Sequence, residues 1–244
     1  MEKMIAADFR TAVEKDPAWA SKLKEPVEIT GFCDMEGSKI THLSPLLHFT
    51  GRDEQGRTAN FFHCEALTVA EGNFIGFVGF VSCSIQRIGK LTITAPSHGG
   101  MAAHFNDCKF LEVAEGVFPG YVRFNKCGIV KIGELTTEVN KAGAAASFRA
   151  CEKLKVAEGT FPGHVDFSGS GIEEIGDLKF AGTNPKKKTA DFRGCRRLRK
   201  IPIKFNINSI EADEPLLRLM RQDHAGKERL RPKKLAPGEI EMEL

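Results

Sequence analysis

Residues 61–76 read FFHCEALTVAEGNFIG, and the same string returns with few changes as FNDCKFLEVAEGVFPG at residues 105–120 and as FRACEKLKVAEGTFPG at residues 148–163. A fourth copy, FRGCRRLRKIP, starts at Phe192 and then departs from the pattern. The leading Phe residues lie 44, 43 and 44 positions apart. Self-similarity at a fixed period predicts a repeat architecture, in which each unit buries its apolar edge against the next.

A related half-unit lies between these copies, and it again carries Cys three residues after Phe, except that Ser170 replaces the last Cys. Together the half-units give seven regularly spaced Phe residues: Phe61, Phe80, Phe105, Phe124, Phe148, Phe167 and Phe192. Ala or Val stands two residues before each of them, and apolar residues at every second position indicate a short strand with one buried face. Seven such strands in register would form a parallel sheet about 30 Å long.

The segments that follow each Cys are of two kinds. The first kind continues as C-x-x-L-x-V-A-E-G-x-F, and its repeated Gly72, Gly116 and Gly159 predict a turn that needs a permissive backbone. The second continues as C-x-I-x-x-I-G-x-L, followed by a polar return that is rich in Gly, Pro and Ser. Since a coil has only 19 to 25 residues, a full helix does not fit in each return, and we expect strands and short turns.

The string V-x-F-x-x-C-x-I-x-x-I resembles the L-x-L-x-x-[NC]-x-L core of leucine-rich repeats. Residues 156–176, VAEGTFPGHVDFSGSGIEEIG, are similar to the bacterial and phage-type repeats of that family. The resemblance covers residues 59–202, and residues 27–46 fit it more loosely. Units such as ANFFHC and ADFRGC are also similar to pentapeptide repeats, which is the weaker alternative because the unit fails after one or two copies.

Both resemblances imply a right-handed parallel solenoid. We therefore predict a mainly β (α/β-type) leucine-rich-repeat-like solenoid of about seven to eight coils over residues 27–205. A helical N-terminal cap is expected over residues 1–26, with a break near Pro17 and one apolar face made by Ile5, Phe9, Ala12, Val13, Trp19 and Leu23. A basic helical cap is assigned to residues 206–234, starting near Pro215, and a flexible tail to residues 235–244.

The chemistry-bearing residue types do not form a known catalytic pattern. The chain has seven Cys, all but one in the repeated column, without a C-x-x-C pair, so we expect them to pack as small apolar groups. The seven His fall in no metal or nucleophile motif, and His104 and His164 are expected on strands, facing solvent. We predict a non-enzymatic protein with no cofactor, metal or small-molecule substrate.

The N-terminal sequence and the length of the apolar runs indicate where in the cell the protein is expected. Residues 1–25 are charged throughout and lack the features of a signal peptide, and no apolar run reaches the length of a membrane span. We therefore expect a cytoplasmic protein without a membrane-spanning segment.

Side chains beside each Phe are expected to face outward, and they vary from coil to coil while the inward positions do not. Repetition gives solenoids an extended binding surface, so this variation predicts a site for a protein partner of unknown identity. We expect the N-terminal end of this surface to be apolar and exposed, and the surface to become basic toward its C-terminal end. The predicted protein-binding residues are Phe62, Val81, His104, Asn106, Arg123, Asn125, Arg149, Asp166, Asp191 and Arg193.

An alternative function follows from the uneven charge. Between Lys186 and Lys234 there are sixteen Lys or Arg against six Asp or Glu, so this segment carries +10 and the rest of the chain −7. Such a block attracts nucleic acid or another polyanion. The candidate residues are Lys186, Lys187, Lys188, Arg196, Arg197, Arg199, Lys200, Arg229, Arg231, Lys233 and Lys234. A further alternative, a secreted effector that acts on host proteins, would use the same outward surface as the first hypothesis.

Overall fold

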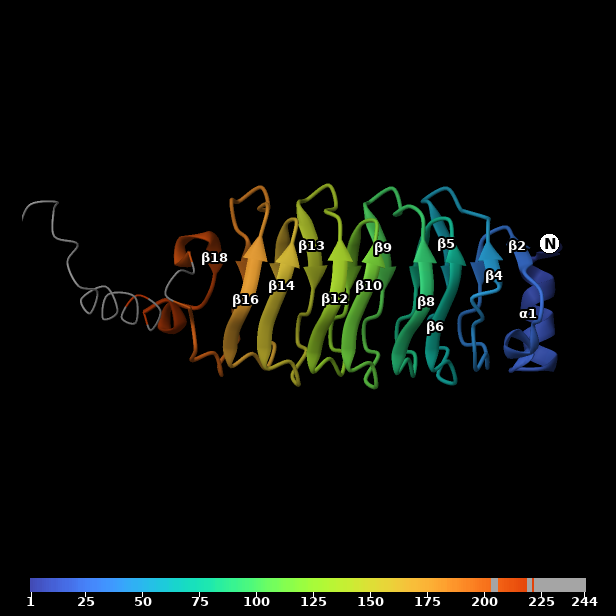
Figure 1. Ribbon diagram of the computed structural model, residues 1–244, viewed down its shortest axis with the longest axis horizontal. Coiled ribbons are helices and arrows are strands. Elements are labelled where there is room, and N and C mark those ends of the chain that lie inside the picture. Colours follow the sequence, from blue (N-terminus) through green and yellow to red (C-terminus); the bar gives the residue numbers. More distant parts are fainter. Residues whose placement is uncertain (203–205, 219–220, 222–244) are drawn as a thin grey trace, which may run out of the picture.

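The computed structural model describes residues 1–202, 206–218 and 221 as an elongated parallel β-solenoid of about nine turns (Figure 1). Each regular turn places one strand on each of two facing sides of the solenoid. The sequence predicted seven to eight coils, and additional strands at both ends account for the difference. The predicted class, a mainly β solenoid with short helices near its ends, is confirmed.

One face is a parallel sheet of nine short strands, which we call the short-strand sheet. Its register aligns Ala59 with Val78 and Val78 with Ala103, so the alternating Ala and Val column of the sequence is one column of the sheet. The strands are β3 (Cys33–Asp34), β5 (Arg57–Asn60), β7 (Phe77–Gly79), β9 (Met101–His104), β11 (Tyr121–Arg123), β13 (Ala144–Ser147), β15 (His164–Asp166), β17 (Ala190–Asp191) and β18 (Ile210–Glu211).

The opposite side of the solenoid is formed by longer strands, and we call it the long-strand face; the sequence predicted strands and short turns there but not a second face of aligned strands. It comprises β1 (Glu2–Ile5), β2 (Val27–Thr30), β4 (Leu47–Phe49), β6 (Val69–Phe74), β8 (Arg87–Ile93), β10 (Val113–Phe118), β12 (Lys131–Thr137), β14 (Val156–Phe161) and β16 (Glu174–Phe180). Its hydrogen-bonded ladder has three segments, β1-β2-β4-β6-β8, β10-β12 and β14-β16.

The expected VAEG turns are therefore strands. In β6 the inward positions are Ala70, Gly72 and Phe74. The alternating apolar pattern of a strand is weak in the sequence here, because two of these three residues are small. Gly72, Gly116 and Gly159 do have positive φ angles of 109°, 112° and 111°, so the need for a permissive backbone is confirmed. Each stands where the register with the next strand shifts, which makes a bulge inside a strand.

The seven repeated Phe residues stack face to face along the solenoid axis and are fully buried. Successive ring centroids lie 5.2 to 5.5 Å apart, with interplanar angles of 8° to 15°. Phe residues of the long-strand face meet this column edge-on, as Phe118 does against Phe124 at 6.3 Å and 79°. The core is thus a continuous aromatic column with a second row of rings beside it.

The Cys column packs beside the Phe column, as predicted, and all seven thiols are buried and free. In each regular case the Sγ donates to the backbone carbonyl of the preceding coil; Cys127 Sγ, for example, lies 2.7 Å from the Phe105 oxygen. Ser170 instead donates to the carbonyl of its own Phe167 at 2.6 Å. Burial raises the pKa of Cys151 to about 12, so this thiol stays protonated at neutral pH.

Cys33, the seventh cysteine, belongs to another column. The register pairs it with Ala59, which places Met35 at the Phe position and Ser38 at the Cys position of the first coil. The Oγ of Ser38 lies 3.4 Å from Cys64 Sγ and so continues the column. The coil at residues 27–50 is therefore more regular than its sequence indicates.

The N-terminal end is closed by α1 (Ala6–Lys15) and the 3₁₀ helix η1 (Trp19–Lys22). The buried Phe9 ring contacts Phe49 at 5.8 Å, edge to face, and so covers the first coils. The break predicted near Pro17 is confirmed, since α1 ends at Lys15 and η1 starts at Trp19. Ile5 is not on the apolar face of the helix, because it ends the edge strand β1 and is 56% exposed.

At the C-terminal end the parallel sheet continues past residue 205, because β18 pairs with β17. The short 3₁₀ helix η2 (Ile207–Ser209) precedes β18, and a helical segment begins at Glu214, just before Pro215 as expected. The proposed flexible tail lies outside the described residues. So do four of the candidate polyanion ligands, Arg229, Arg231, Lys233 and Lys234.

Replacing Phe124 by Ala should destabilise the protein by about 3–5 kcal/mol, because the ring is buried between Phe105 and Phe148 and leaves a cavity. Chemical denaturation followed by circular dichroism measures the change. Phe110→Ala is the matched control, since that ring is 60% exposed and its loss should change stability little. Equal losses in the two variants would contradict the stacked core.

Ala150→Gly should stabilise the protein by about 0.5–1 kcal/mol, because Ala150 has a φ of +57° and the equivalent residues Gly169 and Gly194 are glycines. The control is Ala66→Gly, at an exposed turn position without a positive φ, where added chain entropy should destabilise instead. The midpoints of unfolding of the two variants are each compared with that of the parent protein. A loss of stability in Ala150→Gly would mean that the turn is not strained.

Candidate protein-binding surface

The residues that precede each Phe form one outward column of the short-strand sheet. The register aligns Asn60 with Gly79, Gly79 with His104 and each later member with the next, as predicted. The structure adds Asp34 before this series and Glu211 after it. The complete column reads Asp34, Asn60, Gly79, His104, Arg123, Ser147, Asp166, Asp191 and Glu211.

Short polar side chains of both outward columns hold the backbone of the column that follows each Phe. Asp166 Oδ1 accepts the backbone N–H of Ser168 at 2.8 Å, and Asn125 Oδ1 accepts that of Arg149 at 3.2 Å. Asn106 Oδ1 accepts the N–H of Asn125 at 3.1 Å. Many of the predicted polar residues therefore hold the backbone in place, and the larger side chains between them are left to contact a partner.

A third row on this sheet was missed by the sequence analysis. The register pairs Arg57 with Phe77, Tyr121 with Met101 and Ala144 with His164. The spacing from this row to the Phe column alternates between three and four residues, because β5, β9 and β13 each contain a bulge. These residues therefore do not recur at a constant distance from the repeated Phe, and a repeat of fixed period does not align them.

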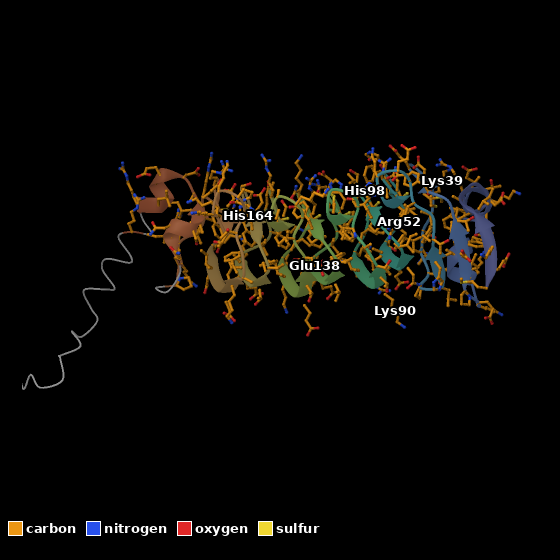
Figure 2. The ribbon with its side chains drawn as sticks, turned by 90° about the horizontal axis from the view of Figure 1, so that it is seen from above. Lys39, Arg52, Lys90, His98, Glu138 and His164 are labelled. Carbon is orange, nitrogen blue, oxygen red and sulfur yellow. The ribbon has the colours of Figure 1, made fainter. Side chains whose placement is uncertain are left out.

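A pocket of about 420 Å³ opens beside this third row. Phe77 and Met101 line it together with Arg57, and the loops at residues 51–56 and 95–100 supply the other side chains. His98 of the second loop also lines the pocket. Seen from above, His98 and His164 lie toward one side of the solenoid and Lys90 of the long-strand face lies on the other (Figure 2).

The N-terminal part of the surface is less exposed than predicted. Phe62 is half-buried, because its ring lies on the backbone of Gly79, where a Cβ would come within 2.3 Å of the ring. The Phe62 ring also meets His104 edge-on at 6.0 Å. Val81 is half-buried too, so the expectation of an exposed apolar end is wrong.

The centre of the surface carries positive charge. The Arg123 guanidinium lies 5.4 Å from the centroid of the Tyr121 ring, and Arg149 is exposed on the next coil. Burial, together with a smaller effect of the nearby Arg123, lowers the pKa of His104 to about 4, so His104 is neutral at pH 7. Neither His104 nor His164 simply faces solvent as expected, since the Nε2 atom of each is buried without a hydrogen-bond partner among the described residues.

The C-terminal part of the surface is acidic and not basic. Arg193 forms ion pairs with Asp191 and, at 3.0 Å, with Glu211. Asp166 belongs to the same column, so three carboxylates face one guanidinium. The predicted change from an apolar to a basic end is therefore wrong, because the register places acidic residues around Arg193.

The predicted polyanion residues do not form a single patch. Lys186, Lys187 and Lys188 lie in the loop before β17, whereas Arg196, Arg197, Arg199 and Lys200 follow β17 in the turn that contains Cys195. The loop lies on the edge of the solenoid where the long strands end, which we call the loop edge (residues 51–56, 95–100, 139–143 and 182–188). The turn lies on the opposite edge (Figure 1).

The described residues contain no group of three or more His, Cys, Asp or Glu placed to hold a metal ion. Among them there is also no helix with the length and apolar character needed to cross a bilayer. A scan against protein-family models, a search of curated proteins and a search of solved structures found no match to this chain.

The half-buried His104 should make the protein less stable in mild acid. The unfolded chain takes up a proton near pH 6.5, whereas the folded His104 does so only near pH 4, so stability that is present above pH 6.5 is lost as the pH falls through this window. The His104→Gln variant should lose less stability between about pH 7 and 5 than the parent protein. NMR titration of His104 with a pKa close to 6.5 would contradict this assignment.

Proposed function

We propose that the protein is a non-enzymatic module that binds a protein partner on the outward surface of its short-strand sheet. The observation that carries the proposal is the 420 Å³ pocket lined by Phe77, Met101 and Arg57, together with the contact of Arg123 with Tyr121 on the strand next to Met101. Aromatic residues, Met and Arg are the types enriched in the energetically important centres of protein interfaces. A pocket beside such a group suits a single anchoring side chain of the partner.

The charges on this surface favour a particular kind of partner. Arg123 and Arg149 are at the centre, with Asp34 near one end and the Asp166 and Glu211 carboxylates at the other, where Asp191 is buried beneath its ion pair with Arg193. A complementary partner would present acidic side chains opposite the two arginines and an apolar or aromatic side chain to the pocket. Complementarity of this kind steers association and selects partners more than it adds affinity.

We assign the solenoid to the leucine-rich-repeat kind as part of this proposal. The support is the role of the Cys column, whose thiols bond to the backbone of the preceding coil, which is what the resemblance implies for the Asn/Cys position. A cytoplasmic protein and a secreted effector would both use this surface, and the source of the captured partner distinguishes them.

The test is affinity capture from a nuclease-treated lysate of the source cell, using three immobilised proteins. These are the parent chain, the Arg123→Glu/Arg149→Glu variant, and the control Lys90→Glu/Lys131→Glu on the long-strand face. The two variants change the net charge equally, and all four side chains are at least partly exposed. We expect one protein to be retained by the parent and the control and lost from the first variant.

Circular dichroism spectra must show that each variant is folded. Retention of the same proteins by the Arg123→Glu/Arg149→Glu variant, or their loss from the long-strand control alone, would overturn the placement of the binding surface. Arg193 is left unchanged, because its ion pairs with Asp191 and Glu211 make it a structural residue.

A further inference from the structure

The turns that follow the Cys column form one continuous edge of the solenoid, opposite the loop edge. We call it the Cys-turn edge; it is the lower edge in Figure 1 and comprises residues 63–68, 82–86, 107–112, 126–130, 150–155, 169–173 and 194–200. Basic side chains gather on its C-terminal half: Lys109, Lys126, Lys153, Lys155, Arg196, Arg197, Arg199 and Lys200. This edge is separate from the proposed protein-binding surface.

Two neighbouring hollows lie along this half of the edge. The first, of about 530 Å³, is lined by Phe110 with three lysines, Lys109, Lys126 and Lys153, and one carboxylate, Glu152. The second, of about 400 Å³, is lined by Lys155 and by the basic residues of the turn at 194–200. Lys153 and Lys155 belong to the same turn, so the two hollows form one track.

The positive charge on the track is only partly neutralised. Glu173 pairs with Lys155 at 2.6 Å and Glu174 with Lys200 at 3.1 Å. Asp107 pairs with Lys109 at 3.2 Å. Within the described residues, no carboxylate forms an ion pair with the other five basic side chains: Lys126, Lys153, Arg196, Arg197 and Arg199.

The fold does not require an aromatic side chain at Phe110. Its side chain is 60% exposed, whereas the Phe residues of the central column are fully buried. Other coils place Ala66, Lys153 and Arg197 at the same position, two residues after Cys. An exposed ring among three lysines suits stacking on a nucleobase, and sequence-tolerant binding of single strands combines such stacking with a basic groove.

We propose that the Cys-turn edge binds single-stranded nucleic acid, with Phe110 stacked on a base and Arg196, Arg197 and Arg199 on the phosphates. From β9 to β17 there are four strand steps, or about 19 Å, which suits a site of about four nucleotides. A single strand is favoured over a duplex because stacking on Phe110 needs an unpaired base. The forked guanidinium group also matches phosphate oxygens in pairs.

The test is fluorescence anisotropy of the full chain with a labelled oligothymidylate of about ten nucleotides at about 50 and 200 mM salt. We expect binding that weakens steeply with salt. Arg196→Glu/Arg197→Glu should reduce affinity at least about tenfold and flatten the salt dependence. Phe110→Ala should reduce affinity at least about fivefold with the salt dependence unchanged, as expected for the loss of one stacked base.

The matched control is Lys186→Glu/Lys187→Glu, which makes the same change in charge on the loop edge and should bind like the parent protein. Absence of binding by the parent protein at low salt would overturn the proposal. So would an equal loss in the control, or unchanged affinity in Phe110→Ala. Competition by polyglutamate as effective as that by unlabelled oligonucleotide would identify an acidic protein as the better ligand and also overturn it.

Discussion

Face-to-face stacking of one Phe per coil is the constraint on which the rest of the structure depends. The ring centroids repeat every 5.2 to 5.5 Å, close to the usual spacing of about 4.8 Å between strands. A single Phe ring therefore packs beneath each of the short strands β5 to β17, and the adjacent thiol reaches back to the carbonyl of the preceding coil. Because aromatic and hydrogen-bonding partners both come from the neighbouring coil, a coil is stabilised mainly by those on either side of it.

This repeated interior fixes the positions of the outward side chains without fixing their identity. Neighbouring outward residues are one strand spacing apart along the solenoid, and short Asn and Asp side chains hold the backbone between them. The short-strand sheet can then carry a basic, aromatic centre between acidic ends, while the Cys-turn edge carries arginines that form no ion pair within the described part of the chain. The two proposed sites occupy separate surfaces of one rigid scaffold, so each can be altered by substitution without removing the other.

The sequence allowed the short-strand sheet to be predicted because its inward residues, Ala or Val followed by Phe, are apolar at a period of two. The long-strand face was missed because its inward positions include Ala and Gly, as Ala70 and Gly72 illustrate. The row at Phe77 and Met101 was missed because bulges change its spacing from the Phe column. The charge at the C-terminal end was misjudged because the pairing of Arg193 with Glu211 depends on a strand beyond the regular repeat.

Distances between spin labels along the Cys-turn edge test the stacked column most directly. Glu65, Glu152 and Arg196 each follow the Cys-column residue of their coil and are exposed, while the native thiols are buried. Labels at Glu65 and Glu152 are four coils apart, and those at Glu65 and Arg196 are six apart. The account predicts backbone separations of about 19 and 29 Å with narrow distributions. If the distance between labels at Glu65 and Arg196 were no longer than that between Glu65 and Glu152, or if either distribution were broad, a single continuous column would be contradicted.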